Sequence, residues 1–255
     1  MKISIITTAF NSGKTIEDTI RSVLSQSYED FEHIIVDGGS KDNTMEIVGV
    51  YEDQYEGRLK YVSEPDKGIY DAMNKGIRMA TGDVIGILNS DDFYASKEVL
   101  LEISKGIANT QIIYGDLDFV DSKDTTKIIR KWEGSQYKKG AFFKGWHPAH
   151  PTFYARKECF DKMGLFDLSF NVSADFELML RFIEKGGFSS NYLPLTMVKM
   201  RLGGESTGSI KNIIKGNKNV LKAFQKNGYK IPHFYLIRRL GPKGVQMFKR
   251  KLHLI

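Results

Sequence analysis

Apolar residues of the first 108 positions occur either in short continuous runs or at every third or fourth position. The continuous runs predict strands at residues 3–6, 31–36, 59–62 and 84–88. The spaced residues predict amphipathic helices at about residues 16–24, from 42–44 onward, and at 69–80 and 96–108. Because each strand is followed by a helix, the pattern predicts a mostly parallel, doubly wound α/β sheet of Rossmann-like type with right-handed crossovers.

Beyond residue 108 the pattern contains more strands. Residues 112–114, 117–120 and 128–132 are expected to be strands, and the charged turn at 121–126 predicts that the last two form an antiparallel hairpin. Helices are expected at 156–163 and from 173 onward. The sequence thus predicts an α/β domain with a small antiparallel hairpin portion.

Polar residues follow the strands of this expected sheet at their C-terminal ends. These residues are Thr8, Asp37, Asp66 and Asp91. In an open α/β sheet the C-terminal strand ends lie along one edge, where ligands bind, so we expect the four side chains to gather there.

The stretch Asn89-Ser90-Asp91-Asp92 directly follows the apolar run 84–88. Adjacent carboxylates repel each other and require a cation, N–H donors or water. One interpretation is a divalent metal that carries a phosphate. The other is a solvated turn in which Asp91 or Asp92 begins the next helix.

Composition narrows the class of protein. A chain of 255 residues, 41% hydrophobic and 27% charged, is long enough for one large core with an appended segment. Cys159 is the only cysteine, which excludes an intramolecular disulfide and suits a reducing cytosol. Residues 1–6 are expected to form a strand rather than a signal peptide, and no apolar run reaches the about 18 residues of a membrane span. No Gly-x-Gly-x-x-Gly or Gly-Lys-Ser/Thr loop occurs, which argues against a dinucleotide site and a P-loop.

Positive charge is concentrated in residues 206–255. This segment has 12 Lys and Arg and no Asp or Glu, and subtracting these charges from the net +6 leaves −6 for residues 1–205. Its apolar residues recur at helical spacing between lysines, so we expect a basic amphipathic helical tail after a domain at 1–205. Such a tail could bind an anionic membrane surface, pack on the domain or bind nucleic acid.

Five ordered motifs resemble one known family. They are Thr7-Thr8-Ala9-Phe10-Asn11, Val36-Asp37-Gly38-Gly39-Ser40, Ala80-Thr81-Gly82-Asp83, Asn89-Ser90-Asp91-Asp92 and Ala174-Asp175-Phe176-Glu177. Over roughly residues 1–200 the chain resembles the inverting family 2 glycosyltransferases of GT-A fold. Residues 63–76 resemble the branch that builds bacterial O-antigen, capsule and exopolysaccharide.

The resemblance implies a nucleotide site. Thr8 and Asp37 would hold the nucleoside, with Asp37 accepting from a uracil ring, and Asp66 and Asn74 would line the same cleft. Taken alone, Asp37 could equally cap a turn beside the glycines that follow it.

The resemblance also implies a metal and a base. Asp91 would bind Mn²⁺ or Mg²⁺, Asn89, Asp92 and His150 would contact the donor and its diphosphate, and Asp175 would be the general base. Asn89 stands where many relatives have the first Asp of Asp-x-Asp, which leaves the division of roles among the three residues open. Taken alone, Asp175 could be a helix N-cap, and His147 and His150 could be ordinary loop histidines.

The function implied by the resemblance is the transfer of a sugar from a nucleotide-sugar, with a UDP-sugar expected, to a hydroxyl of a saccharide or lipid-linked acceptor. The protein would be cytoplasmic and peripheral on the inner membrane face, with no nucleic acid as a partner. Two alternatives are a non-catalytic nucleotide- or membrane-binding module of the same fold and a nucleotidyltransferase, which would release pyrophosphate instead of a nucleoside diphosphate.

Overall fold

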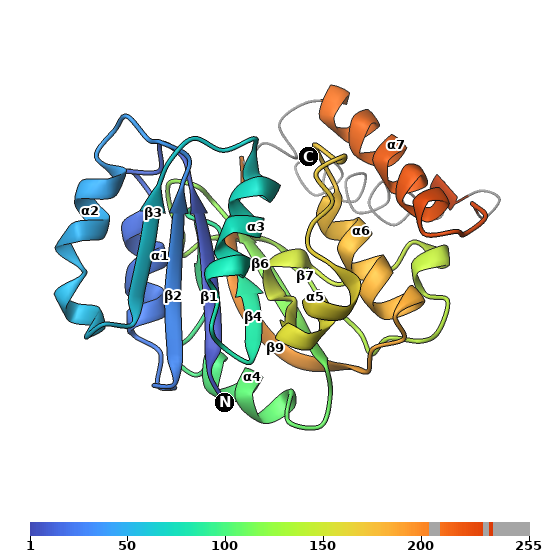
Figure 1. Ribbon diagram of the computed structural model, residues 1–255, viewed down its shortest axis with the longest axis horizontal. Helices are drawn as coiled ribbons and strands as arrows, with labels where there is room; N and C mark the ends of the chain where they lie inside the picture. The colour runs from blue at the N-terminus through green and yellow to red at the C-terminus, as the bar shows by residue number, and fades with distance from the viewer. Residues whose placement is uncertain (204–209, 232–234, 237–255) are drawn as a thin grey trace, which may run out of the picture.

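The computed structural model describes residues 1–203, 210–231 and 235–236, and the side chains of all of these except 210–214 (Figure 1). Nine strands form one sheet: β1 Ile3–Ala9, β2 Phe31–Asp37, β3 Leu59–Ser63, β4 Val84–Ile87, β5 Asp92–Tyr94, β6 Ile112–Val120, β7 Ile128–Trp132, β8 Tyr154–Arg156 and β9 Ser190–Arg201. The α-helices are α1 Ile16–Leu24, α2 Thr44–Val50, α3 Ile69–Met79, α4 Val99–Gly106, α5 Lys157–Met163, α6 Ala174–Leu180 and α7 Ile210–Lys226. Short 3₁₀ turns lie at Asp53–Tyr55, Phe142–Lys144 and His150–Thr152, and a π turn, Arg181–Lys185, continues α6.

The strands are ordered β3-β2-β1-β4-β8-β6-β9-β5, with β7 attached to β6. Strands β3, β2, β1 and β4 are parallel, which confirms the doubly wound α/β sheet, and β6–β7 is the expected antiparallel hairpin. The antiparallel part is larger than this hairpin, because β8 lies antiparallel between β4 and β6, and β5 runs antiparallel to β9.

Helices cover both faces of the sheet over two separate apolar clusters. Helices α3, α5, α6 and α7 contribute to one cluster, and α1, α2 and α4 to the other. Ile34 and Ile35 are neighbours in β2 but belong to different clusters, as the alternation of side chains along a strand requires. Consecutive apolar residues are therefore buried on both faces, which explains why the central strands are continuous apolar runs.

Glycine at position 86 allows β8 to lie against β4. Gly86 is directly opposite Tyr154 in this pair, and a Cβ atom at Gly86 would lie 2.0 Å from the tyrosine ring. The Tyr154 hydroxyl shares a hydrogen bond with the hydroxyl of Tyr94 in β5. The buried ring of Tyr154 thus takes the space that a side chain at position 86 would need.

The second half of α7 packs on the domain. Val220, Ala223 and Phe224 are fully buried, and the Phe224 ring lies 5.7 Å from that of Phe176 in α6 and 5.4 Å from that of Phe143. This part of the tail therefore buries its apolar face against protein, as the packing alternative expects. The side chains of 210–214 and the basic residues from 237 onward lie outside the described residues.

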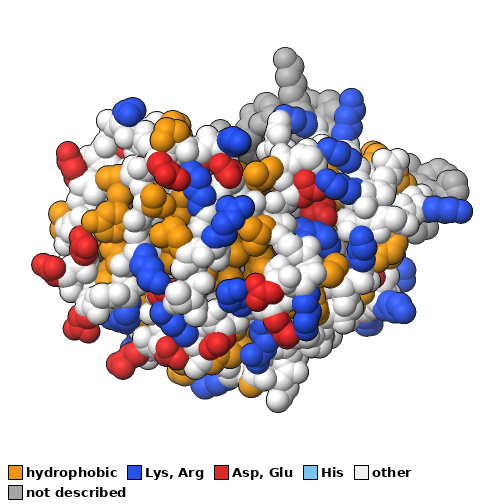
Figure 2. Space-filling model, in the orientation of Figure 1, with side chains coloured by type: hydrophobic (Ala, Val, Ile, Leu, Met, Phe, Trp, Pro, Cys, Tyr) orange, Lys and Arg blue, Asp and Glu red, His pale blue; other side chains and the backbone are white. Residues whose placement is uncertain are grey.

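Charges on the described surface are unevenly placed. Lysines line the visible side of α7, whereas acidic side chains gather at the margin over α2 (Figure 2). Within the described residues, none of the helices is both long and apolar enough to span a membrane.

Asn74 joins α3 to the segment that precedes α6. Its Nδ2 donates to the carbonyl of Phe166, and its Oδ1 accepts from the N–H of the same residue, both at 2.9 Å. The side chain is buried, and both of its polar atoms are used within the protein. These contacts give Asn74 a structural role, and its expected place in a nucleotide cleft stays a prediction.

We expect Asn74→Ala to lower the free energy of unfolding by about 1–3 kcal/mol, because it leaves two buried backbone groups of Phe166 without their partners. Urea denaturation at neutral pH measures the change. The control is Asn109→Ala, at an exposed position after α4, where the expected change is within about 0.5 kcal/mol. Equal losses in the two variants would contradict the structural role.

Candidate active site

The loops that follow β1, β2 and β4 meet at one edge of the sheet (Figure 1). The Asn11 N–H donates to Oγ of Ser40 at 2.7 Å, which joins the first loop to the second. The hydroxyls of Ser12 and Ser90 share a hydrogen bond of 2.7 Å, which joins the first loop to that after β4. The expected gathering of strand ends is therefore present in the structure.

Asp37 holds the loop after β2. Its carboxylate is fully buried, and Oδ2 accepts from the N–H groups of Gly39 and Ser40 at 3.1 and 2.9 Å and from the Ser63 hydroxyl at 2.6 Å. The other oxygen accepts from the Ser40 hydroxyl. These bonds tie the Asp37 carboxylate to the backbone of its own loop and to β3.

Phe10, Gly38 and Asp66 form the more open part of this edge. The Phe10 side chain is 65% exposed although it is large and apolar. A Cβ atom at Gly38 would lie 2.7 Å from Oδ2 of Asp66 and 3.3 Å from the Phe10 ring, so both side chains lie close to this backbone position. An aromatic face beside a carboxylate oxygen suits a planar, N–H-bearing ring. Our sequence interpretation gave Phe10 no role, although an apolar residue in a polar strand-end loop was a signal.

Buried polar atoms without a partner collect near the end of β4. Oδ1 of Asp92 and Oδ1 of Asn89 have none in the described structure, and neither has Oγ1 of Thr8 on the neighbouring strand. Asn89 Nδ2 donates to the other oxygen of Asp92 at 3.2 Å. Buried polar groups are almost always paired in proteins, so this cluster of unpaired oxygens indicates a ligand or cation.

The electrostatics of the Asp91–Asp92 pair also indicate a ligand or cation. Burial raises the pKa of Asp91, and burial together with the charge of Asp91 raises the pKa of Asp92 well above its usual range. The positive charge of Arg201 lowers the pKa of both carboxyl groups and so opposes this shift in part. Carboxylate and amide oxygens are suitable ligands for Mg²⁺ or Mn²⁺, so the residues present fit a divalent cation. Among the described residues, no three His, Cys, Asp or Glu side chains form a metal site by themselves.

Arg201, at the end of β9, is a site residue that our sequence interpretation missed. Its guanidinium is 7% exposed, donates to the Asp91 carbonyl at 2.6 Å, pairs with Asp18 of α1 and lies 4.9 Å above the Phe93 ring. It thereby fixes the turn that carries the two carboxylates. We did not predict strand β9, because Pro194 interrupts its apolar stretch.

Asp175 lies in the first turn of α6. The preceding Ser173 has φ of +67°, a left-handed conformation that costs a non-glycine residue free energy and is often found at functional sites. The Asp175 carboxylate is partly buried and accepts from the Tyr70 hydroxyl at 3.2 Å.

The two loop histidines have different surroundings. His150 packs its ring edge-on at 5.7 Å from Phe166; burial lowers the pKa of His150, and the charge of Asp175 opposes this shift. His147 has Nδ1 2.9 Å from the Pro148 carbonyl and packs against Trp132 and Phe176. His150 is thus close enough to Asp175 to interact with it, whereas His147 is part of the packing.

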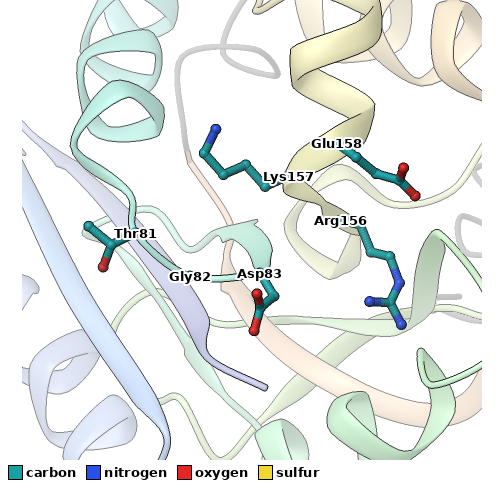
Figure 3. Close-up of a pocket in the computed structure, with 6 residues that line it drawn as sticks. All are labelled: Thr81, Gly82, Asp83, Arg156, Lys157 and Glu158. Atoms are coloured by element: carbon teal, nitrogen blue, oxygen red, sulfur yellow. The ribbon is translucent and has the colours of Figure 1, made fainter.

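A shallow cavity of about 290 Å³ lies at the opposite edge of the sheet, before β4. It is lined by Thr81, Gly82, Asp83, Arg156, Lys157 and Glu158. Their side chains point in different directions instead of converging (Figure 3). Arg156 is occupied by the carbonyls of residues 107, 108 and 110, so we do not regard the cavity as a second site.

Two solved structures share this architecture. TarS residues 1–349 of S. aureus, in complex with UDP, align with 94% of this chain and 72% of that chain at a TM-score of 0.70 and 17% identity. The mannosyltransferase PcManGT of Pyrobaculum calidifontis, in complex with GDP-Man and Mn²⁺, aligns with 92% and 67% at a TM-score of 0.65 and 19% identity. At these identities the similarity shows the fold, which is GT-A.

Sequence relatives extend over most of the chain. A PGL/p-HBAD biosynthesis glycosyltransferase of Mycobacterium bovis is 27% identical over 214 residues, 81% of this chain and 79% of the relative. An uncharacterized glycosyltransferase of Mycobacterium tuberculosis is 32% identical over 184 residues, 70% of this chain and 68% of the relative. Residues 4–162 also match the sequence model described as glycosyl transferase family 2. The chain therefore belongs to glycosyltransferase family 2 and is a glycosyltransferase of GT-A fold.

Proposed function

We propose that this glycosyltransferase moves a sugar from a nucleotide-sugar, with a UDP-sugar favoured, to a hydroxyl of a saccharide or lipid-linked acceptor, with inversion at the anomeric carbon, in bacterial surface polysaccharide synthesis. The observation that carries the proposal is the cluster of unpaired oxygens of Thr8, Asn89 and Asp92 beside Asp91 at the strand ends. A donor diphosphate with its cation supplies the partners that this cluster lacks.

The nucleotide would lie between the loops after β1, β2 and β3. Phe10 offers an aromatic face to the base, and Asp66 Oδ2 offers an acceptor for a ring N–H, which uracil, thymine and guanine have and cytosine and adenine lack. Thr8 offers an unpaired hydroxyl to the nucleoside. Asp37 would act by fixing the backbone of its loop. The related folds were solved with UDP, UDP-GlcNAc and GDP-Man, so they support a nucleotide-sugar without deciding the base.

Asp91 would hold Mn²⁺ or Mg²⁺, with Asn89 and Asp92 contributing oxygens to the cation or the donor. A bound cation of this kind stabilises the negative charge of a departing diphosphate as a Lewis acid. Arg201 keeps the carboxylate turn in place through the Asp91 carbonyl. His150, near Asp175, could also reach the donor diphosphate.

Asp175 would be the general base. One of its oxygens accepts a hydrogen bond from the Tyr70 hydroxyl. The other would take the proton of the acceptor hydroxyl while the hydroxyl oxygen attacks the anomeric carbon. The new bond forms on the face opposite the departing diphosphate, which inverts the anomeric configuration.

Calorimetric titration with UDP, GDP and dTDP, with and without Mn²⁺, tests the donor site. We expect Mn²⁺-dependent UDP binding that Asp91→Asn weakens at least tenfold, or about 1.4 kcal/mol, because one ligand charge is lost. The matched control is Asp161→Asn on the exposed side of α5, which should bind like the wild type. Tighter GDP or dTDP binding would change the donor class, and no nucleotide binding at all would favour the non-catalytic module.

Asp175→Asn separates binding from chemistry. We expect UDP affinity to stay within about twofold while the rate of sugar transfer falls by about 10²–10⁴, the usual contribution of a general base. Product analysis by mass spectrometry follows UDP release against time. Retained turnover would assign the base elsewhere, and release of pyrophosphate would identify a nucleotidyltransferase.

We also propose that the protein works at the inner face of the cytoplasmic membrane, where a lipid-linked acceptor is available. The described half of α7 buries its apolar face on α6, so this face is not available to a bilayer. The support for the proposal is therefore the positive charge of residues 206–255. Residues 237–255 have six Lys and Arg and follow this packed helix.

Vesicle flotation tests the membrane proposal with the whole chain and with a chain that ends at residue 236. We expect the whole chain to bind vesicles with anionic lipid, and to release them as salt is raised from 0.1 to 0.5 M. The shorter chain, which keeps α7, should bind far less. Equal binding by the two would exclude residues 237–255 as the contact.

A further inference from the structure

Two residues of α3, one helical turn apart, contact the segment that leads to the proposed base. Asn74 is bonded through both atoms of its amide to the backbone of Phe166. Tyr70 stacks its ring on that of Phe166 at 5.6 Å and 30°, and its hydroxyl reaches the Asp175 carboxylate. Residues i and i+4 lie on the same face of a helix, so α3 supports this segment at two consecutive levels.

The Tyr70 hydroxyl is placed to act as a donor. It lies 3.2 Å from Oδ1 of Asp175, and no other side chain in the described structure donates a hydrogen bond to this carboxylate. Burial raises the pKa of Tyr70, and the negative charge of Asp175 raises it further, so the phenol stays protonated near neutral pH. A protonated phenol beside a carboxylate can only donate, which fixes the direction of the bond.

The opposite side of the segment is held by α7. The side-chain amide of Asn219 donates to the Val172 carbonyl at 2.7 Å, next to Ser173 with its positive φ. The segment that leads to Asp175 is therefore held by α3 at Phe166 and by α7 at Val172. Because the backbone is held on both sides, the remaining freedom of the carboxylate is rotation about its side-chain bonds, and the Tyr70 hydroxyl is the contact that restricts it.

We propose that Tyr70 is a positioning residue for the transfer reaction: it holds Oδ1 of Asp175 so that Oδ2 faces the acceptor hydroxyl. This inference rests on the function proposed above. The same helix begins directly after the loop of Asp66, whose Oδ1 accepts from the Gly68 N–H at 2.7 Å. Through α3, the loop that borders the nucleotide is thus joined rigidly to the base.

The test compares Tyr70→Phe with Tyr61→Phe in the full chain. Tyr70→Phe keeps the ring against Phe166 and removes only the hydroxyl. Tyr61, on the outer strand β3, also donates its hydroxyl to a carboxylate, that of Glu52 at 3.0 Å, and is a matched control away from the site. The assay is Mn²⁺-dependent UDP release from UDP-glucose, UDP-galactose and UDP-GlcNAc with water as the acceptor, together with calorimetric UDP binding.

For Tyr70→Phe we expect kcat to fall about tenfold while the donor KM and the UDP affinity stay within twofold. The acid limb of the kcat–pH profile should move to higher pH, because the charged carboxylate loses a donor that stabilises it. Tyr61→Phe should match the wild type in all four quantities. A purely structural role would not shift the pH profile in this direction.

A second comparison distinguishes positioning from general destabilisation. In the Asp175→Asn background, Tyr70→Phe should change the residual rate less than twofold. The effects of two substitutions on the rate do not add when one residue acts through the other. An equal tenfold loss there would overturn the inference. So would an unchanged kcat with a raised donor KM, which would make Tyr70 a donor contact. A wild type that binds UDP but releases none from any donor would instead refute the proposed function, and with it this inference.

Discussion

Burial of two adjacent carboxylates at the end of β4 is the constraint on which the rest of the site depends. Placing negative charge in a poorly solvated position costs free energy, and Asp92 has one oxygen without a partner. The chain reduces this cost in part through Asn89 Nδ2 and through Arg201, which reaches across from β9 and is itself paired with Asp18. The proposed divalent cation and donor diphosphate would supply the partner that this oxygen lacks.

The same constraint explains why strands distant in sequence are joined in one sheet. Arg201 ends β9, and β9 pairs with β5, whose first residue is Asp92. Pairing Asp92 with Met200 brings Arg201 to the carboxylate turn. The antiparallel additions to the parallel sheet therefore have a chemical consequence, because they bring positive charge to an edge that the parallel strands alone supply mainly with acids.

The sequence was sufficient to predict the parallel half of the fold. Buried parallel strands are apolar runs and amphipathic helices have a clear period, so β1 to β4 and the helices between them were predicted within a few residues. Strands β5 and β8 have three residues each, and β9 contains Pro194 and few fully buried positions, so none produces a periodic signal. These pairings depend on the approach of Tyr154 to Gly86 and on similar contacts that local pattern does not encode.

The hydrogen bonds that individual side chains make near the strand ends could not be predicted from the sequence, for a related reason. A residue type indicates which contacts a side chain can make. It does not indicate whether other parts of the protein already make those contacts, and Asn74 and Phe10 differ in this respect. Asn74 has both polar atoms bonded to Phe166, whereas Phe10 exposes an aromatic face at the cleft. Tyr70 is the clearest case, because its contact with Asp175 spans 105 residues.

The contacts of the basic tail are also not determined by its sequence pattern alone. An amphipathic helix requires a partner for its apolar face, and its sequence is equally compatible with a bilayer or a protein surface. Phe224 resolves this for the described half of α7, since its ring is enclosed by Phe143, Phe176 and Tyr235. That half-helix also holds the carbonyl of Val172, three residues before Asp175, so its packing supports the segment that leads to the proposed base. The proposed membrane contact would then rest on the positive charge of the tail and not on the apolar face that this half-helix buries.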